Sequence, residues 1–144
     1  AAVICLGEAA GRSSISLERV ALNLLDYRIP DNNGAMLTDQ PIRADGPAAY
    51  FSTLPLRSIQ SVLLAAGIPC ELSLTAGTYL CNQVFYTLMD FLYQTDRQIP
   101  AGFIHLPSLP EQVALRKQSQ PSMTLELLER AIRLVLETLP TAGE

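Results

Sequence analysis

The sequence predicts an α/β fold, a sandwich of helices on a largely parallel, twisted sheet, formed by a single domain over residues 1–144. Short apolar runs that suit buried strands alternate along the chain with longer segments whose apolar residues recur at helical spacing. A chain of 144 residues fits one domain, and a hydrophobic fraction of 49% allows a sizeable core. Sites in such sheets gather at the carboxyl ends of strands, so the residues that follow each strand are the first candidates for chemistry.

The first third of the chain contains strand signals and one long connection. Residues 2–6 form an apolar run that ends at Gly7, which predicts a central strand. Residues 16–25 mix branched and charged side chains and are expected to be extended. A turn cluster opens a weakly structured connection over residues 28–46, and a connection of that length is often functional. Pro47 then stands where the first turn of a helix is expected.

The rest of the chain alternates regularly. Apolar residues at helical spacing predict a helix over residues 56–67 that ends at a glycine, and another helix from Leu80 onward. Residues 70–75 and 102–106 are predicted as strands, the second one stopped by a proline. An amphipathic helix with a single leucine-rich stripe is expected over residues 121–139.

Charge and cysteine content exclude several classes of function. A net charge of −4 and a pI near 4.9 give no broad attraction to nucleic acid or to anionic membranes. Three cysteines without paired spacing, together with one histidine, predict neither a disulfide scaffold nor a zinc site, and they favour a reducing compartment. Residues 1–6 are too short for a membrane span and lack a basic leader; because no methionine precedes this apolar run, we expect a longer protein.

Among the cysteines, Cys81 has the setting of a nucleophile. Cys5 and Cys70 lie in strand-like runs, where free cysteine commonly serves as a small buried hydrophobe. Cys81 instead follows a glycine-containing turn and falls in the first turn of a helix, where backbone N–H groups and the helix dipole favour a thiolate. The same N–H groups could stabilise an oxyanion. Position alone leaves a structural cysteine as plausible as a nucleophile.

His105 and Glu18 are the remaining candidates. His105 is the only histidine and stands at a strand end, as either a hydrogen-bonded core residue or a base beside Cys81. Glu18 is either a surface acid paired with Arg19 or Arg28, or the third group that orients the histidine. Spacing does not choose between these interpretations.

Five segments that together cover most of residues 7–112 carry a more specific signal. They are AGRSSISLERVALN, YRIPDNNG, DGPAAYFSTLPL, AGIPCELSLTAGTYLCNQVFY and GFIHLPSLPEQ. In this order they resemble the pyroglutamyl-peptidase I family, also called pyrrolidone-carboxylate peptidases. The resemblance implies a three-layer α/β/α sandwich and a cysteine omega-peptidase that releases pyroglutamate from peptides that carry it at their N-terminus. It also implies a cytoplasmic homotetramer without metal or cofactor.

The resemblance assigns roles to residues of this chain. The family's acid falls on Glu18, its nucleophile on Cys81 and its histidine on His105. Tyr79 and Leu80, just before the nucleophile, are candidates for the walls of a pocket that holds the lactam ring, although they could simply pack the turn. Glu8 stands where relatives often carry Gln or Leu, and a carboxylate in an apolar pocket is costly unless it is paired.

The resemblance also implies that the family's opening strand and its Gly-Phe-x-Pro-Phe-Gly-Gly loop are not in the chain. These would be roughly 60 residues, a large part of the core of a small domain. Two alternatives stay open from the sequence. One is a cysteine hydrolase of the same fold that acts on another small amide, which Glu8 keeps possible. The other is a non-catalytic α/β interaction subunit, against which the intact set of three residues argues.

Overall fold

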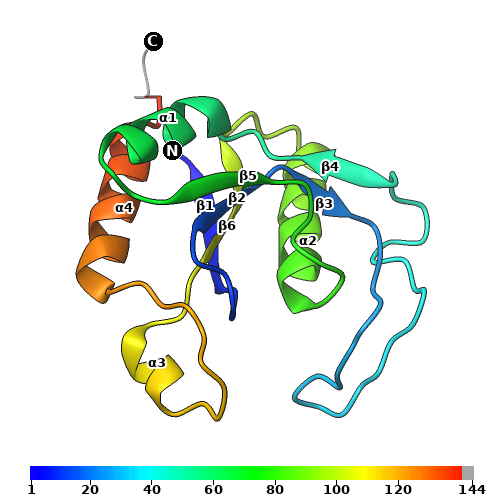
Figure 1. The fold of residues 1–144 in the computed structure, drawn as a ribbon. Coiled ribbons are helices and arrows are strands. Elements are labelled where there is room, and N and C mark those ends of the chain that lie inside the picture. Colours follow the sequence, from blue (N-terminus) through cyan, green and yellow to red (C-terminus); the bar gives the residue numbers. More distant parts are fainter. Residues whose placement is uncertain (141–144) are drawn as a thin grey trace.

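The computed structural model describes residues 1–140, arranged around a four-stranded sheet (Figure 1). The elements in chain order are β1 (Val3–Glu8), β2 (Ile15–Glu18), β3 (Val20–Leu22), β4 (Ala49–Phe51), α1 (Leu56–Ala65), β5 (Cys70–Ser73), α2 (Leu80–Gln94), β6 (Ala101–Leu106), α3 (Pro110–Ala114) and α4 (Leu125–Glu137). The last four residues of the predicted domain, 141–144, lie outside the described residues.

The main sheet has the strand order β1-β6-β2-β5, and two of its three pairings are parallel. Strands β1 and β6 pair in parallel with Gly7 opposite His105, and β2 pairs in parallel with β5. The central pairing of β2 with β6 is antiparallel and sets Ser16 opposite His105. The prediction of a largely parallel sheet is confirmed. However, the reversal puts the carboxyl ends of β2 and β5 at the edge of the sheet opposite to those of β1 and β6.

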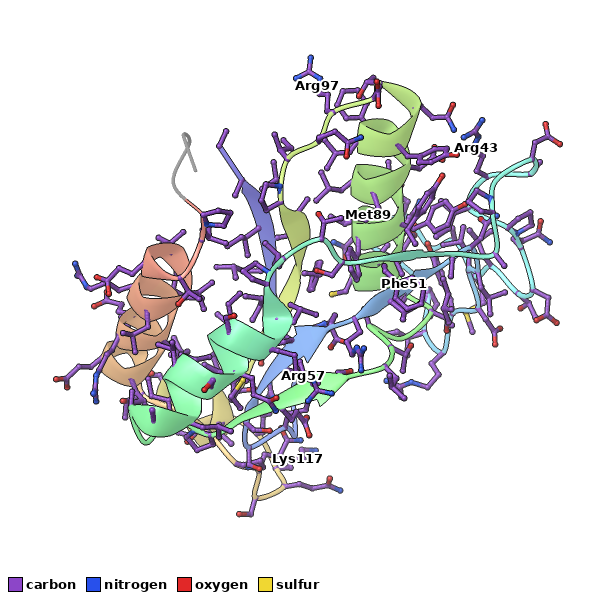
Figure 2. All side chains as sticks on the ribbon, turned by 90° about the horizontal axis from the view of Figure 1, so that it is seen from above. Arg43, Phe51, Arg57, Met89, Arg97 and Lys117 are labelled. Atoms are coloured by element: carbon purple, nitrogen blue, oxygen red, sulfur yellow. The ribbon has the colours of Figure 1, made fainter. Side chains whose placement is uncertain are left out.

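Helices cover both faces of this sheet, which confirms the expected three layers. On one face, α1 and α4 pack on the sheet through a core that includes Ile15, Leu17, Ile59, Leu63, Ile104, Leu128, Ala131 and Val135. On the other face, α2 packs through Ala21, Phe85, Tyr86, Met89, Leu92, Ala101 and Phe103. Figure 2 shows the sheet between these layers, with α2 on one side and α1 and α4 on the other. Within residues 1–140, no helix combines the length and the apolar character needed to cross a membrane.

Local sequence explains where the helices begin and end. Gly67 adopts φ +74°, the left-handed conformation that favours glycine, and so ends α1 where the sequence predicted. The side chain of Thr124 accepts a hydrogen bond from the backbone N–H of Leu127 and caps α4. The final helix therefore begins at Leu125, a few residues later than expected.

Three expectations about local structure were wrong or incomplete. Pro47 does not open a helix, because residues Ala49–Phe51 form β4 and pair with β3, while the Tyr86 hydroxyl donates to the Pro47 carbonyl. The extended segment predicted over 16–25 is divided between two sheets. Helix α3 was not anticipated, since five residues are too few for an apolar period to be visible.

The long connection over residues 28–46 is joined to α2 by a hydrogen-bonded ion pair. The Arg43 guanidinium donates to a carboxylate oxygen of Asp90 at 2.7 Å, and the hydroxyl of Tyr50 donates to the same oxygen at 2.7 Å. Figure 2 shows Arg43 on the far side of α2 from the sheet. Because Asp90 lies on α2 and Tyr50 on β4, this cluster ties the connection and the small β3–β4 sheet to the helix that carries Cys81.

Candidate active site

Cys81 lies in the first turn of α2, directly over the end of β1. A Cβ atom added to Gly7 would stand 3.1 Å from the Cys81 Sγ atom, which shows how closely the thiol approaches this strand. Tyr79, the residue before α2 begins, is extended and makes no side-chain capping hydrogen bond, so it does not cap the first N–H groups of the helix. Unpartnered N–H groups and the dipole of a 15-residue helix favour a negative charge on the sulfur.

His105 and Glu18 form a buried pair on the same face of the sheet. The His105 side chain comes from β6 and that of Glu18 from β2, with relative exposures of 5% and 0%. Nδ1 of His105 lies 2.8 Å from Oε1 of Glu18 and donates to it, because a carboxylate oxygen only accepts. The other ring nitrogen, Nε2, is thereby left to face Cys81. The antiparallel register of β2 and β6 is what brings these residues together although 87 positions separate them.

The surroundings of His105 favour its protonated form. Burial of the ring works to lower its pKa, but hydrogen bonds to Cys81 and Glu18 and the negative charges of both groups outweigh burial. Together they raise the pKa of His105 from 6.5 to about 8. The protonated ring is therefore favoured at this position, so His105 is suited to take the proton of the Cys81 thiol and to pass it on to a leaving group.

Arg12 is a member of the site that the sequence did not single out. Its Nη1 donates to Oε1 of Glu18 at 2.9 Å, the same oxygen that His105 contacts. The sequence suggests Arg19 and Arg28 as partners of Glu18. Arg12 is six positions away, within the loop between β1 and β2. Because this contact depends on how the loop folds back, spacing alone gave no reason to choose Arg12.

Asn82 is the second residue that was missed, and it anchors the nucleophile's helix. The side chain is fully buried, accepts from the backbone N–H of Leu22 and donates to the carbonyls of Leu22 and Leu24 at 2.8, 2.9 and 3.1 Å. These bonds hold the helical turn after Cys81 against β3. The sequence shows an asparagine beside a candidate nucleophile. It does not show that this side chain is buried, so nothing in the sequence singled out Asn82.

Replacing Asn82 with alanine is expected to lower the free energy of unfolding by about 3 kcal/mol, because it leaves buried backbone groups at β3 without their hydrogen-bond partner. Urea unfolding measures this change. Asn33→Ala is the matched control, since Asn33 is exposed, and it should change the free energy by less than about 0.5 kcal/mol. Equal destabilisation by both substitutions would show that Asn82 does not anchor the helix.

A small cavity of about 350 Å³ opens beside the thiol. It is lined by Cys5, Leu6, Leu80, Cys81, Val84 and Phe103. Leu80 therefore stands where a pocket wall was expected. Tyr79 has a different position: its hydroxyl donates to the Pro30 carbonyl at 3.1 Å, and its ring packs edge-on against Tyr27. It ties the long connection to the turn before α2.

The exposed side chain of Glu8 is paired with two partners. Its Oε1 accepts from the Ser108 hydroxyl at 2.5 Å and from the Arg116 guanidinium at 2.6 Å. The hydrogen bonds from Ser108 and Arg116 lower the pKa of Glu8, against a smaller effect of burial. Glu8 thus links the end of β1 to the segment that follows β6, and it does not line the cavity beside Cys81.

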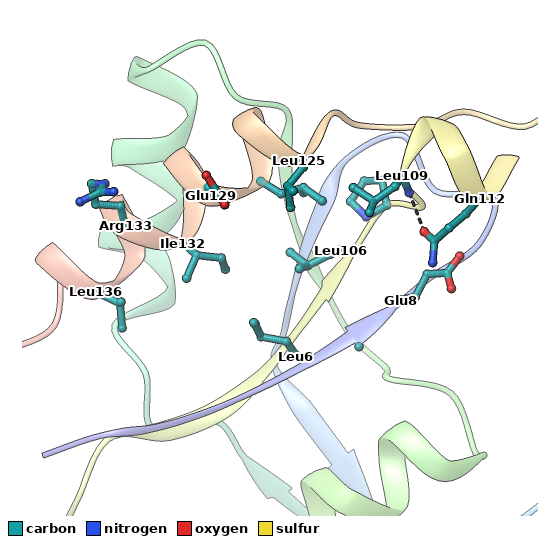
Figure 3. Close-up of a pocket in the computed structure, with 13 residues that line it drawn as sticks. Leu6, Glu8, Leu106, Leu109, Gln112, Leu125, Glu129, Ile132, Arg133 and Leu136 are labelled. Carbon is teal, nitrogen blue, oxygen red and sulfur yellow. Dashed lines mark hydrogen bonds between the residues drawn. The ribbon is translucent and has the colours of Figure 1, made fainter. Parts of the chain in front are cut away.

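A larger cavity, of about 720 Å³, lies on the face of the sheet covered by α4 (Figure 3). The figure shows Leu6 and Leu106 of the sheet facing Ile132 and Leu136 of α4 across this space, with Glu8 at one end. Neither Cys81 nor His105 lines it. Cavity volume therefore does not identify the candidate active site, because Cys81 lines the smaller cavity.

The other two cysteines lack the features of Cys81. Burial raises the pKa of Cys5, and burial together with the charge of Glu71 raises the pKa of Cys70 to about 11. Both thiols are consequently protonated and weakly nucleophilic at neutral pH. Among residues 1–140, no three His, Cys, Asp or Glu side chains are grouped so that they could hold a metal ion.

Comparison with known proteins relates this chain to one family. The profile of a family described as "Pyroglutamyl peptidase" matches residues 1–141. The pyrrolidone-carboxylate peptidase of Gloeobacter violaceus is 55% identical over 138 residues, which are 96% of this chain and 66% of that protein. That of Brevibacillus brevis is 50% identical over 136 residues, which are 94% of this chain and 63% of that protein. The chain thus spans about two thirds of the length of these relatives.

Solved structures agree in fold. A crystal structure of pyroglutamyl peptidase I from Bacillus amyloliquefaciens superposes with a TM-score of 0.91 at 42% identity, over 96% of this chain and 65% of that one. A mutant pyrrolidone carboxyl peptidase from Pyrococcus furiosus gives a TM-score of 0.91 at 41% identity. The three-layer arrangement described above is therefore shared with these enzymes.

Proposed function

Because the chain belongs to the pyroglutamyl peptidase family, we propose that its protein is a cysteine peptidase that hydrolyses the amide bond after an N-terminal pyroglutamyl residue. One observation carries this proposal: a buried His105–Glu18 pair, joined at 2.8 Å, stands beside a thiol in the first turn of a helix. A nucleophile, a base and a group that orients the base are the parts that nucleophilic catalysis on an amide needs. Residues 1–144 serve in this proposal as one catalytic domain.

The first step forms a covalent bond to Cys81. His105 takes the thiol proton at Nε2, while Glu18 holds Nδ1–H and stabilises the imidazolium. The sulfur attacks the carbonyl carbon of the pyroglutamyl residue, and the carbonyl oxygen becomes an oxyanion. The uncapped N–H groups of the first turn of α2 are the candidate donors to this oxyanion, since they adjoin the sulfur and carry the positive end of the helix dipole.

The second step releases the two products. The imidazolium of His105 gives its proton to the departing amine, and the tetrahedral adduct collapses to a thioester on Cys81. His105, neutral again, then takes a proton from water that attacks the thioester. The C–S bond breaks, pyroglutamate leaves, and His105 returns the proton to the sulfur, which restores the thiol. Every proton transfer uses chain residues, so the reaction needs no cofactor.

The lactam ring would lie in the cavity beside the thiol. Leu80, Val84 and Phe103 give it apolar walls of a size that suits one small ring. Tyr79 and Glu8 contribute to substrate binding indirectly: Tyr79 holds the long connection against the turn before α2, and Glu8 fixes the end of β1 next to Gly7.

The family resemblance also supports a cytoplasmic homotetramer as the working form, with peptides that carry N-terminal pyroglutamate as its substrates. Sedimentation analysis of the full-length protein tests the assembly, for which we expect a mass four times that of one chain. A monomeric mass under conditions where the protein is active would contradict the assembly, without affecting the proposed chemistry.

Release of fluorescent aminomethylcoumarin from pyroglutamyl-aminomethylcoumarin tests the activity of the full-length protein. We expect hydrolysis of this substrate and none of the same compound with proline in place of pyroglutamate. Activity on another amide alone would favour a different cysteine hydrolase of this fold. Inactivity on every amide would favour a non-catalytic subunit.

The pH dependence of kcat/KM follows from the state of His105. Its raised pKa means that the ring keeps its proton up to about pH 8 instead of 6.5 and loses it above. Since the imidazolium must protonate the leaving amine, kcat/KM is expected to fall above about pH 8. Initial rates between pH 6 and 10 in buffers of constant ionic strength measure this limb. A rate that stays constant to the top of the range would rule out His105 as the acid.

A further inference from the structure

Glu18 is held through only one of its two oxygens. Oε1 accepts from both His105 and Arg12, at 2.8 and 2.9 Å. Oε2 is buried and has no hydrogen-bond partner among the described residues. Without Arg12, His105 would be the only group in residues 1–140 that fixes the direction of this carboxyl group by a hydrogen bond. A buried carboxyl group held by one hydrogen bond would be poorly fixed in direction.

Arg12 reaches Glu18 from a loop whose shape is defined. The backbone N–H of Arg12 donates to the Ala9 carbonyl at 3.2 Å, and Gly11 between them adopts φ +86°. This tight turn directs the guanidinium back toward β2. The Arg12 side chain is one-third exposed, so it brings a positive charge to a fully buried acid without being buried itself. Arginine is suited to this because its guanidinium stays protonated.

We infer that Arg12 is a positioning residue of the proposed peptidase, holding the Glu18 carboxyl group turned toward His105. The inference rests on the proposed function for its kinetic consequence but on contacts alone for its geometry. Two other titratable groups lie around the pair. They are Cys81 of α2, and Glu71 of β5, which accepts a hydrogen bond from Ser16 opposite His105. Besides His105, the basic side chain that contacts Glu18 among the described residues is Arg12.

Kinetics of two variants test the inference in the full-length protein. Arg12→Gln removes the charge and shortens the side chain but keeps its ability to form hydrogen bonds, and we expect kcat to fall at least tenfold with KM changed less than threefold. Arg12→Lys retains the charge, so its kcat should stay closer to that of the wild type.

Arg19→Gln is the matched control. Arg19 follows Glu18 directly in the chain, yet no ion pair of its side chain occurs within residues 1–140. Its kcat should equal that of the wild type. If Arg12→Gln behaves like this control, the inference is wrong. An equal loss in Arg12→Gln and Arg12→Lys would indicate a merely structural role and would also overturn it.

A spectroscopic readout separates this inference from the proposed function. His105 is the one histidine of residues 1–144, and its Nδ1–H proton resonance is identified in the full-length protein by its absence from His105→Gln. A downfield resonance is expected in the wild type and in Arg12→Lys, and its loss or broadening in Arg12→Gln as the carboxylate turns away. This result can hold even if no pyroglutamyl substrate is cleaved. An unchanged resonance in Arg12→Gln, alongside an active wild type, would refute the inference and leave the function intact.

Discussion

Replacing Cys81 with alanine is expected to reduce hydrolysis of pyroglutamyl-aminomethylcoumarin by about 10⁴-fold or more, to the background of the assay. Without the sulfur no thioester forms, and loss of a nucleophile in comparable triads has effects of that size. The fold should survive, because Cys81 is only partly buried and alanine favours the helix. The far-ultraviolet circular dichroism spectrum and the unfolding midpoint, measured on the same sample, establish that the loss is chemical.

Cys70→Ala is the control for this substitution. Cys70 is buried in β5 on the α1 side of the sheet, where it packs with the core. We expect its removal to cost about 1 kcal/mol of stability and to leave kcat unchanged. Comparable rates for Cys81→Ala and the wild type would eliminate Cys81 as nucleophile, whatever the control shows.

The second large effect is expected at Gly7, where there is no room for a side chain. A Cβ atom there would lie 2.8 Å from Cζ of Phe103 and 3.1 Å from Sγ of Cys81. Phe103 is 2% exposed and packs against the rings of Phe85 and His105, so it cannot swing aside without disturbing the base. In Gly7→Ala the sulfur, the phenyl ring or the strand must therefore move.

We expect kcat of Gly7→Ala to fall about 100-fold, since a displacement near 1 Å at a reacting group can have that effect. The free energy of unfolding should fall by about 1–3 kcal/mol through overpacking. Gly102→Ala is the matched control: its Cβ would meet Ser52 and Leu54, far from the thiol. It should lose similar stability but keep kcat. If Gly7→Ala loses stability and retains full kcat, the close packing of Gly7 on Cys81 is not needed for catalysis.

The elements that could be predicted from sequence are those whose signal is local. Helix α2 shows an apolar period over four turns, and Gly67 marks the end of α1 through a backbone conformation that only glycine adopts easily. Strand β4 could not be predicted in this way. Its three residues are held by pairing with β3, and Pro47 before it gave the competing signal of a helix start.

A site residue could be predicted from the sequence when its role depends on neighbouring residues in the chain, and not when it depends on distant ones. Cys81 could be proposed from its place at a helix start, whereas Glu18 became distinct from other acids only through the family resemblance. Its role depends on the antiparallel register of β2 and β6, a long-range property that spacing does not encode. Arg12 and Asn82 were missed for the same reason, since their partners are set by how a loop and a helix fold back on the sheet.

Labelling with pyroglutamyl chloromethyl ketone tests both the proposed recognition and the proposed nucleophile, because the reagent combines the pyroglutamyl group with a group that alkylates a reactive thiol. The full-length protein is inactivated with the reagent, and peptide mass spectrometry then locates the modified cysteine. We expect modification of Cys81 in proportion to lost activity, with Cys5 and Cys70 unmodified. Inactivation that follows modification of Cys5 or Cys70, or full activity after complete modification of Cys81, would contradict the proposed mechanism.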